Sequence, residues 1–273
     1  MENKEGIVQP LGAGHIIAAL DMNLDAALAY VNLTKDKGIL YKVGMQLYNE
    51  MFMSILSKAN QSDDTGTFEI AAKVNEFLNL TKGKIFLDLK LVDIPQSMVG
   101  ALKAILAVIN PLFFNIMAVA GPKSISGVAT IKGKSGLIIV TFLTSNSNDD
   151  CQTIHHGNTN DIVPELAFMG SENGADGIVC STLELPVLME NCYDGIIIVP
   201  GIKTEEELKN SEVSPDQQRV GTPKGAILGG ATYIVVGRAL MTPPDDAAKL
   251  KALDYFISEC ESADAQLAEE GGE

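Results

Sequence analysis

Residues 86–95 read Phe86-Leu-Asp88-Leu-Lys90-Leu-Val-Asp93-Ile-Pro95 and combine an apolar strand with three charged residues. The stretch begins as an apolar, β-prone strand, and Pro95 is suited to the first turn of a following helix. On an extended chain, side chains two residues apart point the same way, so Asp88 and Lys90 are predicted on one face. Burying unpaired charges is costly, so that face is not ordinary core. The stretch predicts either a surface salt bridge at a strand end or the functional end of an α/β strand.

The remaining chain repeats the same alternation of short apolar strands and helical patterns. Besides the stretch above, the predicted strands are 15–20, 39–43, 113–119, 136–143, 177–180, 195–199 and 233–236. Eight strands alternating with helices are the count of a (β/α)8 TIM barrel, and continuous apolar runs suit strands buried on both faces. A doubly wound open sheet is the alternative, but no GxGxxG motif follows the first strand.

The chain is predicted to form one barrel domain over residues 1–260. The last helix is expected to end near Cys260, leaving 261–273 as an acidic, frayed tail. Two polar stretches, 59–67 and 144–159, are predicted as loops, and the first reads as a surface insertion.

The composition restricts the partners and the compartment. A formal net charge of −15 argues against a nucleic-acid-binding protein, which would carry a basic stripe. Neither a signal peptide nor an apolar run long enough for a membrane span is found, and the four cysteines lack paired spacing. We expect a cytoplasmic protein that binds neither nucleic acid nor a membrane. His155 and His156 have no third ligand in view, so no metal site is predicted.

Polar residues cluster at the predicted carboxyl ends of the strands, which converge on the mouth of a barrel. They are Asp21, Lys42, Asp88, Lys90, Asp93, Thr144, Ser145, Ser147, Gly201, Lys203, Gly237 and Arg238. Each alone has an ordinary explanation, such as a helix cap, a lysine that snorkels to solvent or a surface ion pair. Their joint position favours a functional site. The glycines and the arginine after the last two strands suggest a phosphate site, although turn chemistry also explains the glycines.

These motifs resemble the orotidine 5′-phosphate decarboxylase family over about residues 15–250. The matching segments are Ala19-Leu-Asp21, Lys42-Val-Gly44, residues 88–95, Pro200-Gly-Ile202, Asp216-Gln217 with Arg219, Thr222-Pro223 and Val236-Gly-Arg238. The resemblance implies decarboxylation of orotidine 5′-monophosphate to uridine 5′-monophosphate, the last step of pyrimidine nucleotide synthesis, without a cofactor or metal. It also implies a homodimer.

The resemblance further implies a role for each site residue. The catalytic array would be Lys42, Asp88, Lys90 and, from the neighbouring subunit, Asp93, with Lys90 stabilising the carbanion and supplying the proton. The substrate-binding residues would be Asp21 with Lys42 for the ribose, Thr144 or Ser147 for the pyrimidine, Gln217, Gly237, Arg238 and Lys203 for the phosphate, and Ile94 and Ser97 for the neighbouring subunit's site.

One departure and two alternatives bear on this assignment. Met117 stands where many members of the family have a histidine, which affects the wall of the site. Related sugar-phosphate enzymes, of the 3-keto-gulonate-6-phosphate decarboxylase or hexulose-phosphate synthase type, share the D-x-K-x-x-D motif, and some use Mg²⁺. Ile94-Pro95 and Asp216-Gln217 argue against them. A barrel that binds a phosphate ligand without turnover is the other alternative, and the presence of the lysines and Asp88 argues against it.

Overall fold

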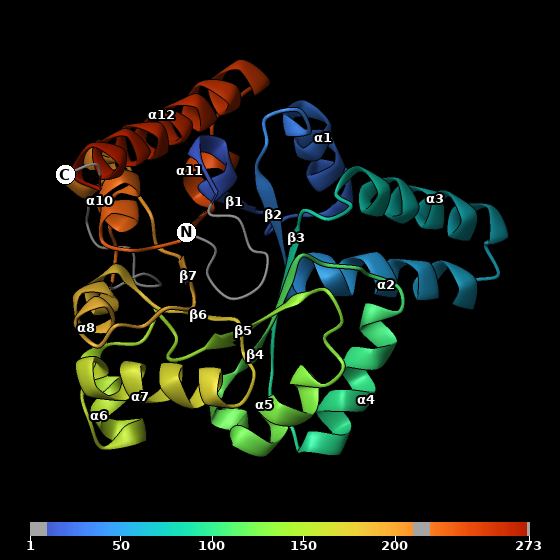
Figure 1. Ribbon diagram of the computed structural model, residues 1–273. Helices are drawn as coiled ribbons and strands as arrows, with labels where there is room; N and C mark the ends of the chain where they lie inside the picture. The colour runs from blue at the N-terminus through green and yellow to red at the C-terminus, as the bar shows by residue number, and fades with distance from the viewer. Residues whose placement is uncertain (1–9, 210–218, 272–273) are drawn as a thin grey trace.

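A computed structural model describes residues 10–209 and 219–271, in which eight parallel strands close into a barrel (Figure 1). The strands are β1 (Ile16–Ala19), β2 (Leu40–Gly44), β3 (Ile85–Leu91), β4 (Phe113–Met117), β5 (Gly136–Val140), β6 (Gly177–Val179), β7 (Ile196–Val199) and β8 (Tyr233–Val236). Each strand pairs with the next along the chain, and β8 pairs with β1. The predicted (β/α)8 fold is confirmed.

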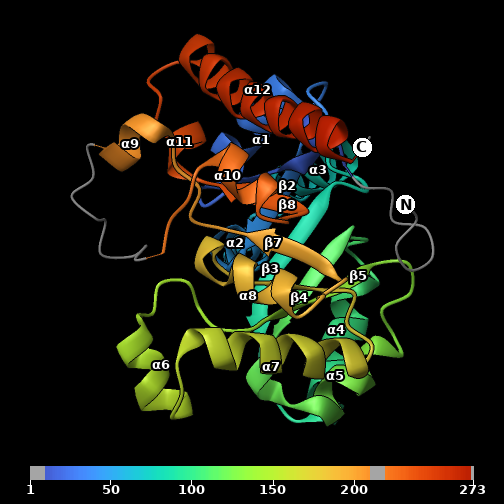
Figure 2. The ribbon, with the colours of Figure 1, turned by 60° about the vertical axis from the view of Figure 1, so that its left-hand side comes forward.

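Helices surround the barrel in both views (Figures 1 and 2). The α-helices are α1 (Leu24–Thr34), α2 (Met45–Asn60), α3 (Asp64–Leu80), α4 (Pro95–Leu106), α5 (Pro122–Ala129), α6 (Asn148–His155), α7 (Thr159–Glu172), α8 (Leu185–Glu190), α9 (Glu205–Lys209), α10 (Pro223–Leu228), α11 (Arg238–Met241) and α12 (Asp246–Glu270). Short 3-10 turns are η1 (Gly12–His15), η2 (Ala118–Ala120) and η3 (Thr182–Glu184).

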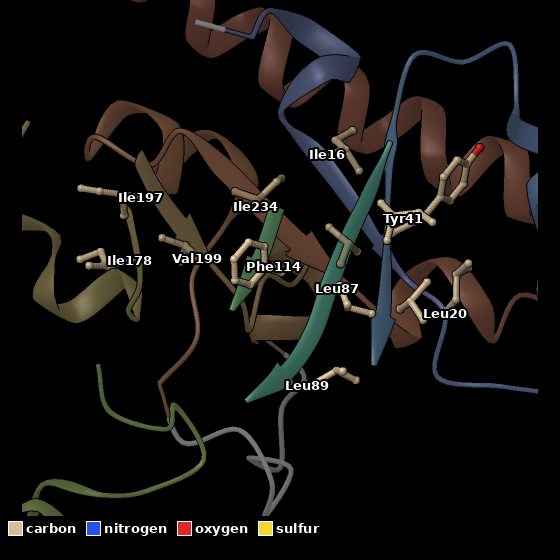
Figure 3. Close-up of a cluster of buried hydrophobic side chains, with 14 of the residues drawn as sticks. Ile16, Leu20, Tyr41, Leu87, Leu89, Phe114, Ile178, Ile197, Val199 and Ile234 are labelled. Carbon is tan, nitrogen blue, oxygen red and sulfur yellow. The ribbon is translucent and has the colours of Figure 1, made fainter. Parts of the chain in front are cut away.

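The pleat of the strands divides the core into two layers. Leu40 and Phe86 belong to an apolar cluster inside the barrel, whereas their neighbours Tyr41 and Leu87 belong to the cluster between the strands and the helices. Figure 3 shows this outer cluster, in which Leu87 and Phe114 come from paired strands. Burial of each such side chain contributes about 1.5–3 kcal/mol to folding. Both faces of every strand are therefore occupied, and only the ends of the barrel remain for a site.

The predicted loop over 59–67 is wrong. Helix α2 continues to Asn60 and α3 begins at Asp64, so only a tight turn separates them. The Asp63 carboxylate accepts a hydrogen bond from the Gly66 amide at 2.9 Å and caps α3. The two helices lie side by side and extend away from the barrel (Figure 1). The polar composition of the stretch thus reflects a helix cap and exposed helix faces. Composition alone does not distinguish these from a loop.

Two further predicted boundaries are wrong for a similar reason. Residues 144–159 contain α6, which opens with a capping box between Ser147 and Asp150. The predicted tail, 261–273, is helical as far as Glu270, because α12 packs against α10, α11 and η1 on the outside of the barrel. There Ala263 is buried, and Asp264 accepts hydrogen bonds from the Gly12 amide and the His15 ring. Acidic composition does not prevent order where one helix face has packing partners.

Within residues 10–209 and 219–271, none of the helices combines the length and hydrophobicity that crossing a bilayer requires.

Candidate active site

A cavity of about 210 Å³ opens at the carboxyl end of the barrel. Inner-facing side chains continue the alternation of the strands, so Lys42 follows Leu40 and Asp88 follows Phe86. Because β2 and β3 are paired in parallel, with Gly44 beside Asp88, these two charged side chains meet above the apolar interior. Apolar side chains form the floor, and the predicted convergence at the mouth is confirmed for these residues.

Four charged side chains form an alternating chain across the cavity. The Lys42 ammonium lies 2.9 Å from Asp21 Oδ1 and 3.4 Å from Asp88 Oδ2. The Lys90 ammonium lies 2.5 Å from Asp88 Oδ1. The Asp88 and Lys42 side chains are only 8% and 13% exposed, whereas the outer members, Asp21 and Lys90, are 55% and 37% exposed. Each of the two buried groups, Lys42 and Asp88, has two opposite charges beside it, which offsets the cost of burying its own charge.

The charged groups of the array stabilise one another's ionised forms. Burial alone would raise the pKa of Asp88, but the Lys42 and Lys90 ammonium groups, with hydrogen bonds from Lys90 and Asn115, lower it below the ordinary value. Burial alone would lower the pKa of Lys42, yet Asp88 and Asp21 raise it. Both directions describe the same attraction, and both groups stay ionised at neutral pH.

The backbone at Lys90 departs from a regular strand. Its φ is +51°, in the left-handed region, which is uncommon for a residue with a side chain and costs on the order of 1–3 kcal/mol. The β3–β4 register shifts between Leu87 and Leu91, which marks a bulge. The sequence predicts Asp88 and Lys90 on one face of a regular strand. Both do line the cavity, but the bulge brings Lys90 there.

The other predicted substrate residues are divided between the cavity and its surroundings. Thr144, Gly201 and Gly237 line the cavity. The Ser147 hydroxyl instead donates to Asp150 at 2.7 Å, as part of the α6 cap, so Thr144 is the better candidate for a contact with the base.

The phosphate candidates lie around the last two strands. Lys203 follows β7, where its amide donates to the Gly221 carbonyl at 2.9 Å, and exposed Arg238 begins α11 after β8. Gln217 lies outside the described residues.

Asp93, Ile94 and Ser97 do not reach this cavity. Asp93 and Ile94 border a separate shallow groove with Val92, Val119 and other residues of the β4–α5 connection, and Ser97 is exposed on α4. The Asp93 carboxylate accepts a hydrogen bond from the Ile94 amide at 2.6 Å. Within one chain the array is therefore Asp21, Lys42, Asp88 and Lys90.

Comparisons with known proteins identify the family of this chain. The model of the orotidine 5′-phosphate decarboxylase / HUMPS family matches residues 14–253. The chain belongs to this family. An orotidine 5′-phosphate decarboxylase of Desulfosudis oleivorans is 32% identical over 90% of this chain and 93% of that protein. One from Nitrosomonas eutropha is 37% identical over 66% of this chain and 75% of that protein.

A solved structure extends the likeness to three dimensions. The crystal structure of orotidine 5′-phosphate decarboxylase from Lactobacillus acidophilus matches with a TM-score of 0.65 and 26% identity, over 89% of this chain and 98% of that one. The resemblance to the family noted from the motifs is confirmed.

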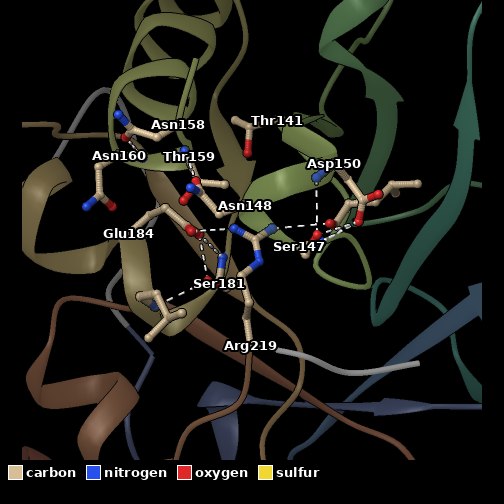
Figure 4. A network of polar contacts seen from close by, with 12 residues as sticks. Thr141, Ser147, Asn148, Asp150, Asn158, Thr159, Asn160, Ser181, Glu184 and Arg219 are labelled. Carbon is tan, nitrogen blue, oxygen red and sulfur yellow. Dashed lines mark hydrogen bonds and ion pairs between the residues drawn. The ribbon is translucent and has the colours of Figure 1, made fainter. Parts of the chain in front are cut away.

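A buried ion pair beside the cavity was missed as a site feature by sequence reasoning. The Arg219 guanidinium, 5% exposed, bonds to the fully buried Glu184 carboxylate (Figure 4). It also donates to the Leu143 carbonyl at 3.1 Å and lies 5.6 Å from the centre of the Phe142 ring. Since Phe142 and Leu143 line the cavity, Arg219 connects the wall after β5 with the segments after β6 and β7.

Glu184 is held from its other side by Ser181. Its second oxygen accepts hydrogen bonds from the Ser181 amide at 2.8 Å and hydroxyl at 2.6 Å. The spacing Ser181-x-x-Glu184 directly after an apolar strand is the signature of a capping box, so it could have identified Glu184. No pattern in the sequence near Glu184 predicts its pairing with Arg219.

No group of three or more histidine, cysteine, aspartate or glutamate side chains suited to a metal ion occurs in the part of the chain that the structure describes. His155 ends α6 and packs its ring edge against Phe142, with the ring centres 5.6 Å apart. Its predicted loop setting is therefore wrong.

Asp88→Asn should flatten the acid dependence of stability. Because folding lowers the pKa of Asp88, its stabilising contribution is complete above the unfolded pKa of about 3.9 and is lost as pH falls through the lower folded value. Urea unfolding at a series of pH values should show a steeper loss below about pH 4 in the wild type than in the variant. Asp254→Asn, at an exposed site on α12, should keep the wild-type slope. Equal slopes for wild type and Asp88→Asn would contradict the assignment.

Proposed function

We propose that this chain is a decarboxylase that converts orotidine 5′-monophosphate to uridine 5′-monophosphate, the last step of pyrimidine nucleotide synthesis. The observation that carries the proposal is Asp88, a buried carboxylate held between two lysine ammonium groups at the cavity. Membership of the family and the names of the relatives support the substrate. The matched family also includes the HUMPS enzymes, which are the hexulose-phosphate synthases named above. A sugar phosphate is therefore the second candidate substrate.

The array suits a reaction that creates negative charge on carbon. In the proposed step the bond between C6 of the pyrimidine and its carboxylate breaks, CO2 leaves, and the electron pair remains on C6. The Lys90 ammonium stabilises this pair and then donates its proton to C6, after which solvent reprotonates the amine. Asp88 and Lys42 keep the ammonium oriented before the reaction begins. No cofactor is required, because the lysine supplies both the charge and the proton.

The remaining contacts are those that the resemblance to the family implies. Asp21 and Lys42 would bind the ribose hydroxyls, and Thr144 the pyrimidine. Gly201 and Gly237 allow the backbone to approach the phosphate, which Arg238, Gln217 and Lys203 would bind. Binding of this remote group is a source of free energy for ordering the reacting part of the substrate.

A homodimer would complete the site. Asp93 is exposed and outside its own cavity, and Val92, Ile94 and Val119 beside it are 57%, 65% and 54% exposed. Such an apolar surface suits an interface that brings Asp93, Ile94 and Ser97 to the neighbouring cavity. Sedimentation should give a dimer, and Ile94→Asp should both weaken the dimer and reduce the activity.

We further propose a cytoplasmic location, which the free thiols Cys151, Cys180, Cys192 and Cys260 suit.

The direct test is the ultraviolet absorbance of orotidine 5′-monophosphate with the purified protein and EDTA. We expect the absorbance of the orotate ring to fall as uridine 5′-monophosphate forms, with the product confirmed by chromatography. No change with folded protein would overturn the proposal. Turnover of a hexulose or keto-gulonate phosphate with Mg²⁺ would then support the second candidate, and binding of uridine 5′-monophosphate without turnover would indicate a binding protein.

A further inference from the structure

Asn115 is a buried polar residue inside the barrel that none of the roles above uses. It lies on β4 between Phe113 and Met117 in the row of inner-facing side chains and is 1% exposed. A buried amide needs partners for both its carbonyl oxygen and its amino group. Both partners belong to the charged array.

The Asn115 side chain bridges Asp88 and Lys90, two neighbouring members of the array. Its Nδ2 donates to Asp88 Oδ1 at 2.6 Å, and its Oδ1 accepts the backbone N–H of Lys90 at 2.8 Å. Asp88 Oδ1 also accepts the Lys90 ammonium at 2.5 Å. One amide therefore holds the carboxylate that orients Lys90 and the backbone that carries Lys90.

The register explains why a side chain is needed at this point. Leu87 pairs with Phe114 and Leu91 pairs with Ile116, so residues 88–90 stand opposite Asn115 alone. In such a bulge the extra residues lack ladder partners. Lys90, with its φ of +51°, turns its N–H to the Asn115 side chain in place of a strand carbonyl.

We propose that Asn115 is a positioning residue for the decarboxylation, which keeps the Lys90 bulge and the Asp88 carboxylate in the geometry that the carbanion requires. It acts through Asp88 and Lys90 and does not itself touch the substrate. This inference rests on the proposed function for its kinetic consequence, but its structural part is measurable without turnover.

Asn115→Leu keeps the approximate volume and removes both hydrogen bonds. We expect kcat to fall on the order of 10²-fold, as for a small misplacement of a reacting group, while the affinity for uridine 5′-monophosphate changes less than about threefold. Thr141→Val is the matched control: Thr141 is equally buried and directly follows the next strand, β5, but its hydroxyl donates to the Val179 carbonyl at 2.8 Å, outside the array. It should keep the wild-type kcat.

Asn115→Asp tests the two hydrogen bonds of Asn115 individually. It retains an acceptor for the Lys90 amide but sets a second carboxylate against Asp88. We expect a low kcat at neutral pH that recovers toward acid, because the introduced carboxyl then carries a proton to donate to Asp88. A merely structural role predicts no new ionisation in the pH profile of kcat.

Amide hydrogen exchange at Lys90 tests the structural part without substrate. Exchange should be faster in Asn115→Leu than in the wild type and in Thr141→Val. If the wild type decarboxylates nothing while exchange at Lys90 is faster in Asn115→Leu, the proposed function is wrong but the structural part of this inference is supported. Unchanged exchange, or a kcat within threefold of the wild type for Asn115→Leu, would overturn the inference.

Discussion

Replacing Lys90 with alanine should lower kcat for decarboxylation by about 10³-fold or more, because in the proposed mechanism this one group supplies both the positive charge at C6 and the proton. The fold should persist, since Lys90 is partly exposed and Asp88 keeps Lys42 at 3.4 Å and Asn115 at 2.6 Å. Removal of the side chain also leaves the cavity open for the product. Single-turnover absorbance measures the rate, and calorimetric titration with uridine 5′-monophosphate measures the binding.

Lys132→Ala is a suitable control for this variant. Lys132 also pairs with an aspartate, Asp176, at 2.6 Å, but these residues precede β5 and β6 at the opposite end of the barrel. Its kcat should match that of the wild type. Near-normal activity of Lys90→Ala would show that another group protonates C6, and loss of product binding would show that Lys90 contributes mainly to affinity.

Replacing Arg219 with methionine should destabilise the protein by about 3–5 kcal/mol, because it leaves the buried Glu184 carboxylate without its ionic partner. The substitution also removes the contacts of Arg219 with the Leu143 carbonyl and the Phe142 ring in the cavity wall. We therefore expect weaker substrate binding in the protein that remains folded. Urea unfolding at neutral pH measures the change in free energy. The kinetic constants below the unfolding transition measure the effect on the cavity.

The double variant Arg219→Met with Glu184→Gln distinguishes the buried charge from the lost packing. Glutamine keeps an oxygen for the Ser181 hydrogen bonds but carries no charge, so much of the lost stability should return. Lys37→Met is the control, because its partner Asp254 is 59% exposed and the pair should contribute about 1 kcal/mol or less. A loss below about 1 kcal/mol for Arg219→Met would show that the pair is not a structural support.

Periodic features of the chain were predictable from the sequence. Apolar runs of strand length recur at intervals filled by helical patterns, and closure of such units gives the barrel. The meeting of Lys42 and Asp88 also follows, because side chains alternate along each strand and parallel strands end on the same side. The motifs around these residues identified the family.

Only the tertiary structure decided the local geometry of the site. The left-handed backbone at Lys90 has no local signal, because a lysine adopts it only where a bulge and the side chain of Asn115 support it. Arg219 and Glu184 lie 35 residues apart in the sequence and meet because they follow neighbouring strands of the barrel, β7 and β6. The order of residues 261–270 likewise comes from packing of α12. Short-range patterns therefore determined the fold and the charged residues, whereas long-range contacts determined how those charges are held.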